Sequence, residues 1–138
     1  MKNIFLILLL FAAVAVNAQT TEGTTITVSI DNVPDGQGKV IVSLFNQDTF
    51  MKAPPIQSES SSIKDGKISV SFTGVAPGEY GVISFHDRND NGKIDMNSTG
   101  IPTEAYGVSN NPMSFGPPQW SEAKFEVTGE PVELKIRY

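Results

Sequence analysis

A cluster of oxygen-bearing side chains lies between residues 87 and 95, in the order Asp-x-Asn-x-Asn-Gly-x-x-Asp. Calcium in proteins takes about 6–8 oxygen ligands, and a tight loop supplies them from side chains at its first, third, fifth and ninth positions and from a carbonyl at the seventh. The glycine at the sixth position permits the sharp turn that brings these oxygens together. The pattern therefore predicts a calcium site formed by Asp87, Asn89, Asn91, the Lys93 carbonyl and Asp95.

The predicted site lacks one strong ligand. A bidentate glutamate usually occupies the twelfth position of such a loop, and this chain has Ser98 there. Only Asp87 and Asp95 are then charged ligands, unless Asp90 or Glu104 joins them, so the site would be weak. The alternative is a plain hairpin, with Asn91 and Gly92 in a type I′ turn and the Asn and Asp side chains bonding local backbone.

The polar stretch continues well beyond this motif, from about residue 87 to residue 122. Loops longer than about 12–15 residues are uncommon inside compact domains unless they are functional. We expect this long, ordered loop to bind a ligand through Glu104, Tyr106, Asn110 and Trp120. Exposed aromatic rings could stack on a sugar, but the favoured interpretation is that they fold back over the core as a lid, because their burial is strongly favourable.

Few residues of the chain suggest catalysis. His86 is the only histidine and there is no cysteine, so neither a thiol nucleophile nor a histidine-rich zinc site can form. We expect His86 to lie at a strand end and to bond loop backbone. A hydrolase of glycans that uses Asp95 and Glu104 as paired carboxylates is an alternative, but a non-enzymatic role is favoured.

The first 18 residues have the features of a secretory signal peptide. Lys2 precedes an apolar run from Ile4 to Val16, and small residues stand before the expected cleavage after Ala18. The run of about 13 residues is shorter than the roughly 20 needed to cross a bilayer, which disfavours a membrane anchor. We therefore expect export to the periplasm or the medium, with residues 19–138 as a single domain that has no membrane span.

The net charge of −5 and the absence of a basic run argue against a nucleic-acid partner. We expect a monomer whose partner is a small molecule, a glycan or an envelope protein. Its role would be that of a non-enzymatic binding module, or alternatively that of a structural accessory in a surface assembly.

Short segments of alternating polar and apolar residues, separated by Gly, Pro and Asp turns, predict an all-β fold. We expect a single antiparallel β-sandwich of about seven strands, immunoglobulin-like in architecture, that ends in a hairpin closed by residues 128–130. Phe50 and Met51 should plug one end. The strands are expected at 24–30, 39–45, 57–63, 68–72, 79–86, 123–127 and 132–138, with a core of Val28, Val42, Val70, Phe72, Val82, Phe125 and Leu134.

Several motifs in fixed order also carry a resemblance. They are Phe85-His86-Asp87-x-Asn89-x-Asn91-Gly92-Lys93-Ile94-Asp95, then Gly100-Ile101-Pro102-x-Glu104-x-Tyr106-Gly107-x-Ser109-Asn110-Asn111, and later Pro117-Pro118. Residues 24–138 thereby resemble the exported bacterial family catalogued as domain of unknown function 2141, which implies a small exported β-sandwich of the prealbumin kind but no activity. Locally, the Asp87–Asp95 motif is similar to the calcium loops of EF-hands, dockerins and bacterial adhesin repeats.

Overall fold

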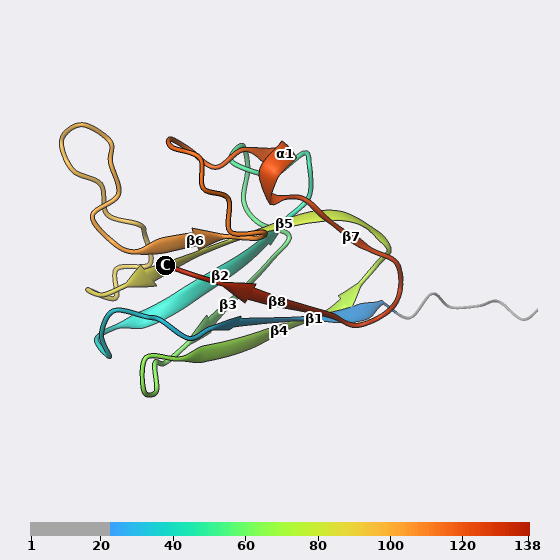
Figure 1. Cartoon of the computed structure of the whole chain (residues 1–138), viewed down its shortest axis with the longest axis horizontal. Helices are drawn as coiled ribbons and strands as arrows, with labels where there is room; N and C mark the ends of the chain where they lie inside the picture. Colours follow the sequence, from blue (N-terminus) through green and yellow to red (C-terminus); the bar gives the residue numbers. More distant parts are fainter. Residues whose placement is uncertain (1–22) are drawn as a thin grey trace, which may run out of the picture.

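Two packed β-sheets form the domain, as the computed structural model shows (Figure 1). The structure describes residues 23–138. The signal peptide predicted for residues 1–18 and the first residues after it lie outside this described part. No helix within residues 23–138 is both long and apolar enough to cross a membrane.

The first sheet has three strands in the order β4-β1-β8. Its central strand β1 (Thr24–Ile30) pairs antiparallel with β4 (Ile68–Val75) and parallel with β8 (Val132–Ile136). β-branched residues fill β1 and alternate residues point into the core, as expected for a strand with one buried face.

The second sheet is antiparallel and has five strands. The polar β3 (Gln57–Ser61) lies at one edge, followed by β2 (Lys39–Phe45), the long β5 (Gly78–Asp87) and the short β6 (Tyr106–Val108). A short strand, β7 (Phe125–Val127), pairs with the beginning of β5, and the single helical turn α1 (Trp120–Ala123) precedes it.

The core between the sheets confirms the predicted sandwich. Five of the seven predicted core residues are buried, while Phe125 and Leu134 are partly buried and pack against the same cluster. Phe50 is buried as predicted, but Met51 is 55% exposed. The left-handed backbone at Met51, with φ of 56°, turns the chain there, so the two neighbours do not share one environment. The five buried predicted residues are Val28, Val42, Val70, Phe72 and Val82.

The predicted C-terminal hairpin is wrong, and there are eight strands rather than seven. β7 pairs with β5 in one sheet, and β8 pairs parallel with β1 in the other. The turn at residues 128–130 therefore carries the chain from one sheet to the other. Alternation showed that each strand has one buried face, but it contains no information about which strand lies beside it.

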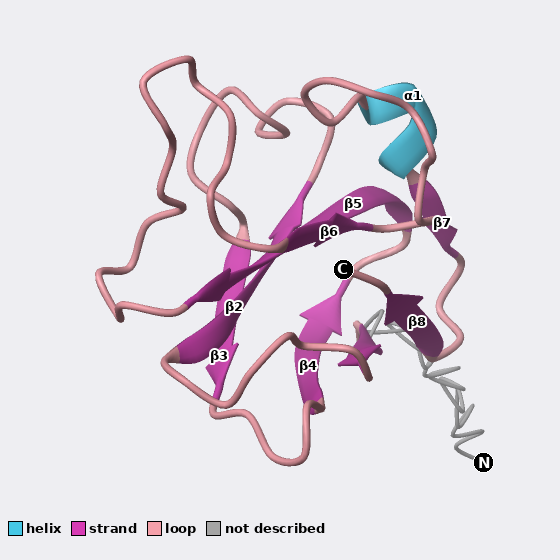
Figure 2. Cartoon of the chain, turned by 60° about the vertical axis from the view of Figure 1, so that its left-hand side comes forward, coloured by secondary structure: helices cyan, strands magenta, loops and turns pink. Residues whose placement is uncertain are grey.

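The two sides of the sandwich differ. On one side β3 and β4 contact each other, and the Gln57 side chain donates to the Thr73 carbonyl across 3.0 Å. On the opposite side the outer strands are β6 and β8. In Figure 2 the loops before and after β6 lie on the side of the domain that faces away from β4. The long polar segment predicted from the sequence therefore lies on the side bounded by β6 and β8, which we call the open side of the sandwich.

Candidate functional site

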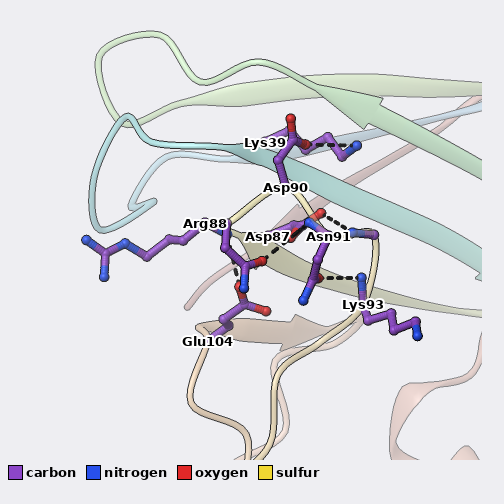
Figure 3. Close-up of polar contacts among 9 residues, drawn as sticks. Lys39, Asp87, Arg88, Asp90, Asn91, Lys93 and Glu104 are labelled. Atoms are coloured by element: carbon purple, nitrogen blue, oxygen red, sulfur yellow. Dashed lines mark hydrogen bonds and ion pairs between the residues drawn. The ribbon is translucent and has the colours of Figure 1, made fainter.

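The long segment starts from a buried carboxylate at the end of β5. Asp87 is fully buried, its Oδ1 accepts the backbone N–H of Asn91 at 3.0 Å, and its Oδ2 accepts that of Gly92 at 2.8 Å (Figure 3). Gly38 packs against the same point, where a Cβ atom would lie 2.0 Å from the Asp87 carbonyl oxygen. One side chain thus fixes the whole turn from beneath.

Two asparagines shape the interior of the turn. Asn89 Oδ1 accepts the N–H of Asn91 at 3.3 Å, and Asn91 Oδ1 accepts that of Lys93 at 2.9 Å. In this turn Asp90 and Gly92 have positive φ values, but Asn91, which lies between them, does not. A type I′ turn needs two successive positive φ values, so the alternative of a plain hairpin at Asn91-Gly92 is wrong. The second feature of that alternative is present, because Asn and Asp side chains accept hydrogen bonds from local backbone N–H groups.

Asp95 lies opposite these two asparagines. Its Oδ2 accepts a hydrogen bond from Asn89 Nδ2 at 2.6 Å, and its Oδ1 accepts one from Asn91 Nδ2 at 2.8 Å. The structure therefore brings together the side chains of Asp87, Asn89, Asn91 and Asp95. The Lys93 side chain extends away from the loop (Figure 3), which leaves only its backbone available to a ligand at this site.

Glu104 closes the loop from outside the motif. It is 8% exposed, its Oε1 accepts the N–H of Arg88 at 3.0 Å, and its Oε2 accepts that of Asp95 at 3.0 Å. Both oxygens are thus held by backbone at the two ends of the turn. A general acid or base has to reach a substrate, and this arrangement ties Glu104 to the fold instead, which speaks against a hydrolase that uses Asp95 and Glu104.

The charges around the loop are unevenly paired. Lys39 bonds Asp90 at 3.0 Å, which holds the pKa of Lys39 above its ordinary value, and Arg88 bonds Asp35 at 2.8 Å. By contrast, no Lys, Arg or His nitrogen of residues 23–138 lies within 4.0 Å of the carboxylate oxygens of Asp87, Asp95 or Glu104. Three carboxylates of this region therefore have amide donors but no direct ion pair, although the charge of Asp87 also contributes to the raised pKa of Lys39.

A metal ion here would depend on neutral ligands. In the part of the chain that the structure describes, no three His, Cys, Asp or Glu side chains are grouped closely enough to hold a metal. Amide and carbonyl oxygens are ordinary calcium ligands, however. Any cation site at this loop must therefore combine carboxylates with the oxygens of Asn89, Asn91 and Lys93.

His86 has the structural role predicted for it. It is 1% exposed, and its Nε2 lies 2.7 Å from the carbonyl oxygen of Gln37 in the turn before β2. Its Nδ1 has no hydrogen-bond partner. A histidine buried in this way positions the turn and offers no exposed nitrogen for acid–base chemistry.

The remaining predicted binding residues do not converge on the Asp87–Asp95 turn. Tyr106 is 37% exposed on β6, whereas the Asn110 Nδ2 group donates to the carbonyls of Glu122 and Lys124, each at 2.9 Å. Trp120 packs edge-on against Phe50, with ring centroids 5.5 Å apart. For Trp120 the geometry is that of the lid favoured from the sequence.

Sequence reasoning missed a groove of about 360 Å³ between β6 and the end of β8, lined by Tyr106, Gly107, Val108, Asn111, Pro112, Met113, Ser114, Gly116, Pro118, Arg137 and Tyr138. Asn110 and Asn111 have φ of 67° and 48°. Asn tolerates this left-handed region, so the Asn-Asn pair could have marked the turn. Nothing in the sequence around Arg137 distinguishes it from the exposed residues of the preceding strand β8.

Comparison with known proteins gives one match. The family model described as "Uncharacterized protein conserved in bacteria (DUF2141)" matches residues 28–135. No curated protein and no solved structure matches the chain.

Proposed function

Since the chain belongs to the DUF2141 family of uncharacterized bacterial proteins, which brings no activity with it, we propose from its own geometry that it is an exported, non-enzymatic binding module. Its long segment is ordered by a weakly bound calcium ion at Asp87–Asp95. The apolar N-terminal segment with small residues before Ala18 supports export.

The observation that carries the calcium proposal is the set of unpaired carboxylates. Asp87, Asp95 and Glu104 surround one turn and have no cationic partner among residues 23–138. N–H donors hold these carboxylates, and a divalent cation would add an opposite charge to the loop. The hydrogen bonds from the N–H groups of Asn91 and Gly92 to Asp87 keep the turn compact, which supports the proposal.

The ion would lie where two amide groups now face Asp95. The Nδ2 groups of Asn89 and Asn91 donate to its two oxygens at 2.6 and 2.8 Å, and they place partial positive charge at that point. Each amide oxygen has two lone pairs, so a rotation that turns these oxygens toward the ion retains an acceptor for the loop backbone. Asp95, Asn89, Asn91 and the Lys93 carbonyl then bind the ion, with Asp87 beneath them.

Few formal charges and no bidentate glutamate in the motif place the affinity with that of weak extracellular calcium modules, about 10⁻⁴–10⁻³ M. Isothermal titration of the metal-free protein with CaCl₂ tests this. We expect one site in that range and little heat from MgCl₂, because magnesium demands a tighter octahedral shell.

The matched variants are Asp95→Asn and Asp90→Asn, two changes of the same charge in the same loop. Asp95 faces the proposed ion, whereas Asp90 pairs with Lys39. Asp95→Asn should weaken calcium binding at least tenfold and Asp90→Asn should change it less than threefold. Equal effects of the two variants would reduce the site to general attraction between the acidic loop and cations.

A further inference from the structure

The groove between β6 and the end of β8 has a tightly built floor. A Cβ atom on Gly107 would lie 2.4 Å from Ile136 Cγ2, 2.7 Å from the Arg137 carbonyl oxygen and 3.1 Å from the Tyr138 ring. Only glycine allows the edges of the two sheets to approach this closely. The groove therefore lies where both sheets meet on the open side of the sandwich.

Apolar and polar groups both line the groove. Tyr106 and Met113, which is 94% exposed, are among its lining residues. Pro112 and Pro118 stiffen the segment around Met113, because each fixes its own φ. Concave surfaces with exposed apolar side chains and a few polar groups are typical of small-molecule sites.

Arg137 supplies the one charged side chain of the groove. No carboxylate oxygen of residues 23–138 lies within 4.0 Å of its guanidinium, whereas Lys39, Arg88, Lys124 and Lys135 are all paired. Lys52, Lys64, Lys67 and Lys93 also have no ion pair within residues 23–138, but none of them lines this groove. The planar fork of N–H donors on Arg137 matches the geometry of a carboxylate.

Two asparagine side chains hold the backbone on both sides of this arginine. Asn111 Nδ2 donates to the Lys135 carbonyl at 2.9 Å, and its Oδ1 accepts the N–H of Arg137 at 2.8 Å. Asn32 Nδ2 donates to the Tyr138 backbone oxygen at 2.8 Å, and Asn32 Oδ1 accepts the N–H of Tyr138 at 3.2 Å. The end of β8 is thereby fixed before any ligand binds, which lowers the entropy cost of binding.

We propose that this groove binds an organic carboxylate attached to an aromatic or branched apolar group. The carboxylate pairs with Arg137 and the apolar group lies against Tyr106, Met113 and Pro118. The inference deepens the binding role proposed above by naming a ligand class. It is independent of the calcium site, because no residue of the 87–95 turn lines the groove.

Titration of the ¹⁵N-labelled protein with benzoate, followed by NMR, tests the proposal. We expect saturable shifts of the Tyr106, Gly107 and Arg137 amide signals at millimolar benzoate. Benzamide has the same ring without the charge and should bind at least tenfold more weakly. N-acetylphenylalanine distinguishes the source of the ligand: tighter binding than benzoate assigns the groove to amino-acid or peptide carboxylates, and weaker binding assigns it to simple organic acids.

The matched variants are Arg137→Gln and Arg88→Gln. The first should weaken benzoate binding at least tenfold and the second should leave it unchanged, because Arg88 pairs with Asp35 outside the groove. Three results would overturn the inference: no saturable shifts up to about 50 mM benzoate, equal binding of benzamide, or full binding by Arg137→Gln. The highest benzoate concentration is about 50-fold above the Kd of a weak ligand, about 10⁻³ M. Retained calcium binding alongside any of the three results would show that the groove proposal failed and the loop proposal did not.

Discussion

Gly92 donates its backbone N–H to Asp87 Oδ2 across 2.8 Å, and this hydrogen bond joins the exposed tip of the loop to a fully buried carboxylate at the end of β5. The loop is therefore shaped by a side chain below it and not by strand pairing. A calcium ion bound at this turn, as proposed above, would add to the support that Asp87 provides.

Glu104 should be needed for stability and not for a reaction. Each of its oxygens accepts a backbone N–H, so Glu104→Gln turns an NH₂ group toward a donor and leaves that donor unsatisfied. We expect a loss of about 1–3 kcal/mol in the free energy of unfolding, measured by urea denaturation. Glu126→Gln, an exposed glutamate on β7, is the control and should change it by less than about 0.5 kcal/mol. Equal stabilities of the two variants would contradict the role of Glu104.

Gly107 should tolerate no side chain. A methyl group there meets Ile136 and the Arg137 carbonyl, and overpacking of this kind costs about 1–3 kcal/mol. Gly36→Ala is the matched control, because a Cβ at Gly36 has no atom within 4 Å. Thermal unfolding of both variants measures the loss of stability. A Gly107→Ala protein as stable as Gly36→Ala would mean that the sheet edges are not in contact.

The Tyr138 hydroxyl is buried without a hydrogen-bond partner, and burial raises the pKa of Tyr138 well above its ordinary value. The folded state therefore favours the neutral phenol. This contribution to stability is fully present below about pH 10, the pKa of tyrosine in an unfolded chain. It is lost as the pH rises further, by up to about 1.4 kcal/mol per pH unit.

Tyr138→Phe removes the group that titrates and a hydroxyl without a partner. The variant should match or exceed the native protein in stability at pH 8, and its advantage should grow between pH 10 and pH 11. Urea denaturation at the three pH values measures this. A parallel decline of both proteins above pH 10 would assign the alkaline loss to other groups.

Phe72 and Phe115 form a matched pair for the core, since Phe72 is fully buried and Phe115 is fully exposed. Phe72→Ala should cost about 3–5 kcal/mol of unfolding free energy, while Phe115→Ala should cost less than about 0.5 kcal/mol. Urea denaturation of the two variants gives both values. A loss below about 1 kcal/mol for Phe72→Ala would place that residue outside the core.

The sequence was sufficient to predict the sandwich, because alternation marks strands with one buried face and strong turn residues mark their ends. The polar residues of β3 fit the edge position that it has in its sheet. Strand pairing could not be predicted in the same way, since β7 and β8 have the same alternation whether or not they form a hairpin. Which strands pair with each other depends on the packing of the whole domain.

The candidate site was predictable in part, for a related reason. The spacing of Asp87, Asn89, Asn91 and Asp95 is local, so the side chains that converge could be named from the sequence. The groove depends on Gly107 and Arg137, which are 30 positions apart and become neighbours only through the fold. Glu104 was named from the sequence as a binding residue, but its bonds to two separate backbone groups were not foreseen.

The central claim is that calcium orders the Asp87–Asp95 turn and thereby stabilises the domain. Binding to the folded state alone adds RT ln(1 + [L]/Kd), which at 10 mM calcium is about 1.4–2.7 kcal/mol for the expected affinity range. The most direct measurement is the melting temperature in 10 mM CaCl₂, in 10 mM MgCl₂ and in excess chelator. We predict a rise of several degrees with calcium, little change with magnesium, and a clearly smaller rise with calcium in Asp95→Asn. Superimposable melting curves of the native protein in calcium and in chelator would contradict the claim.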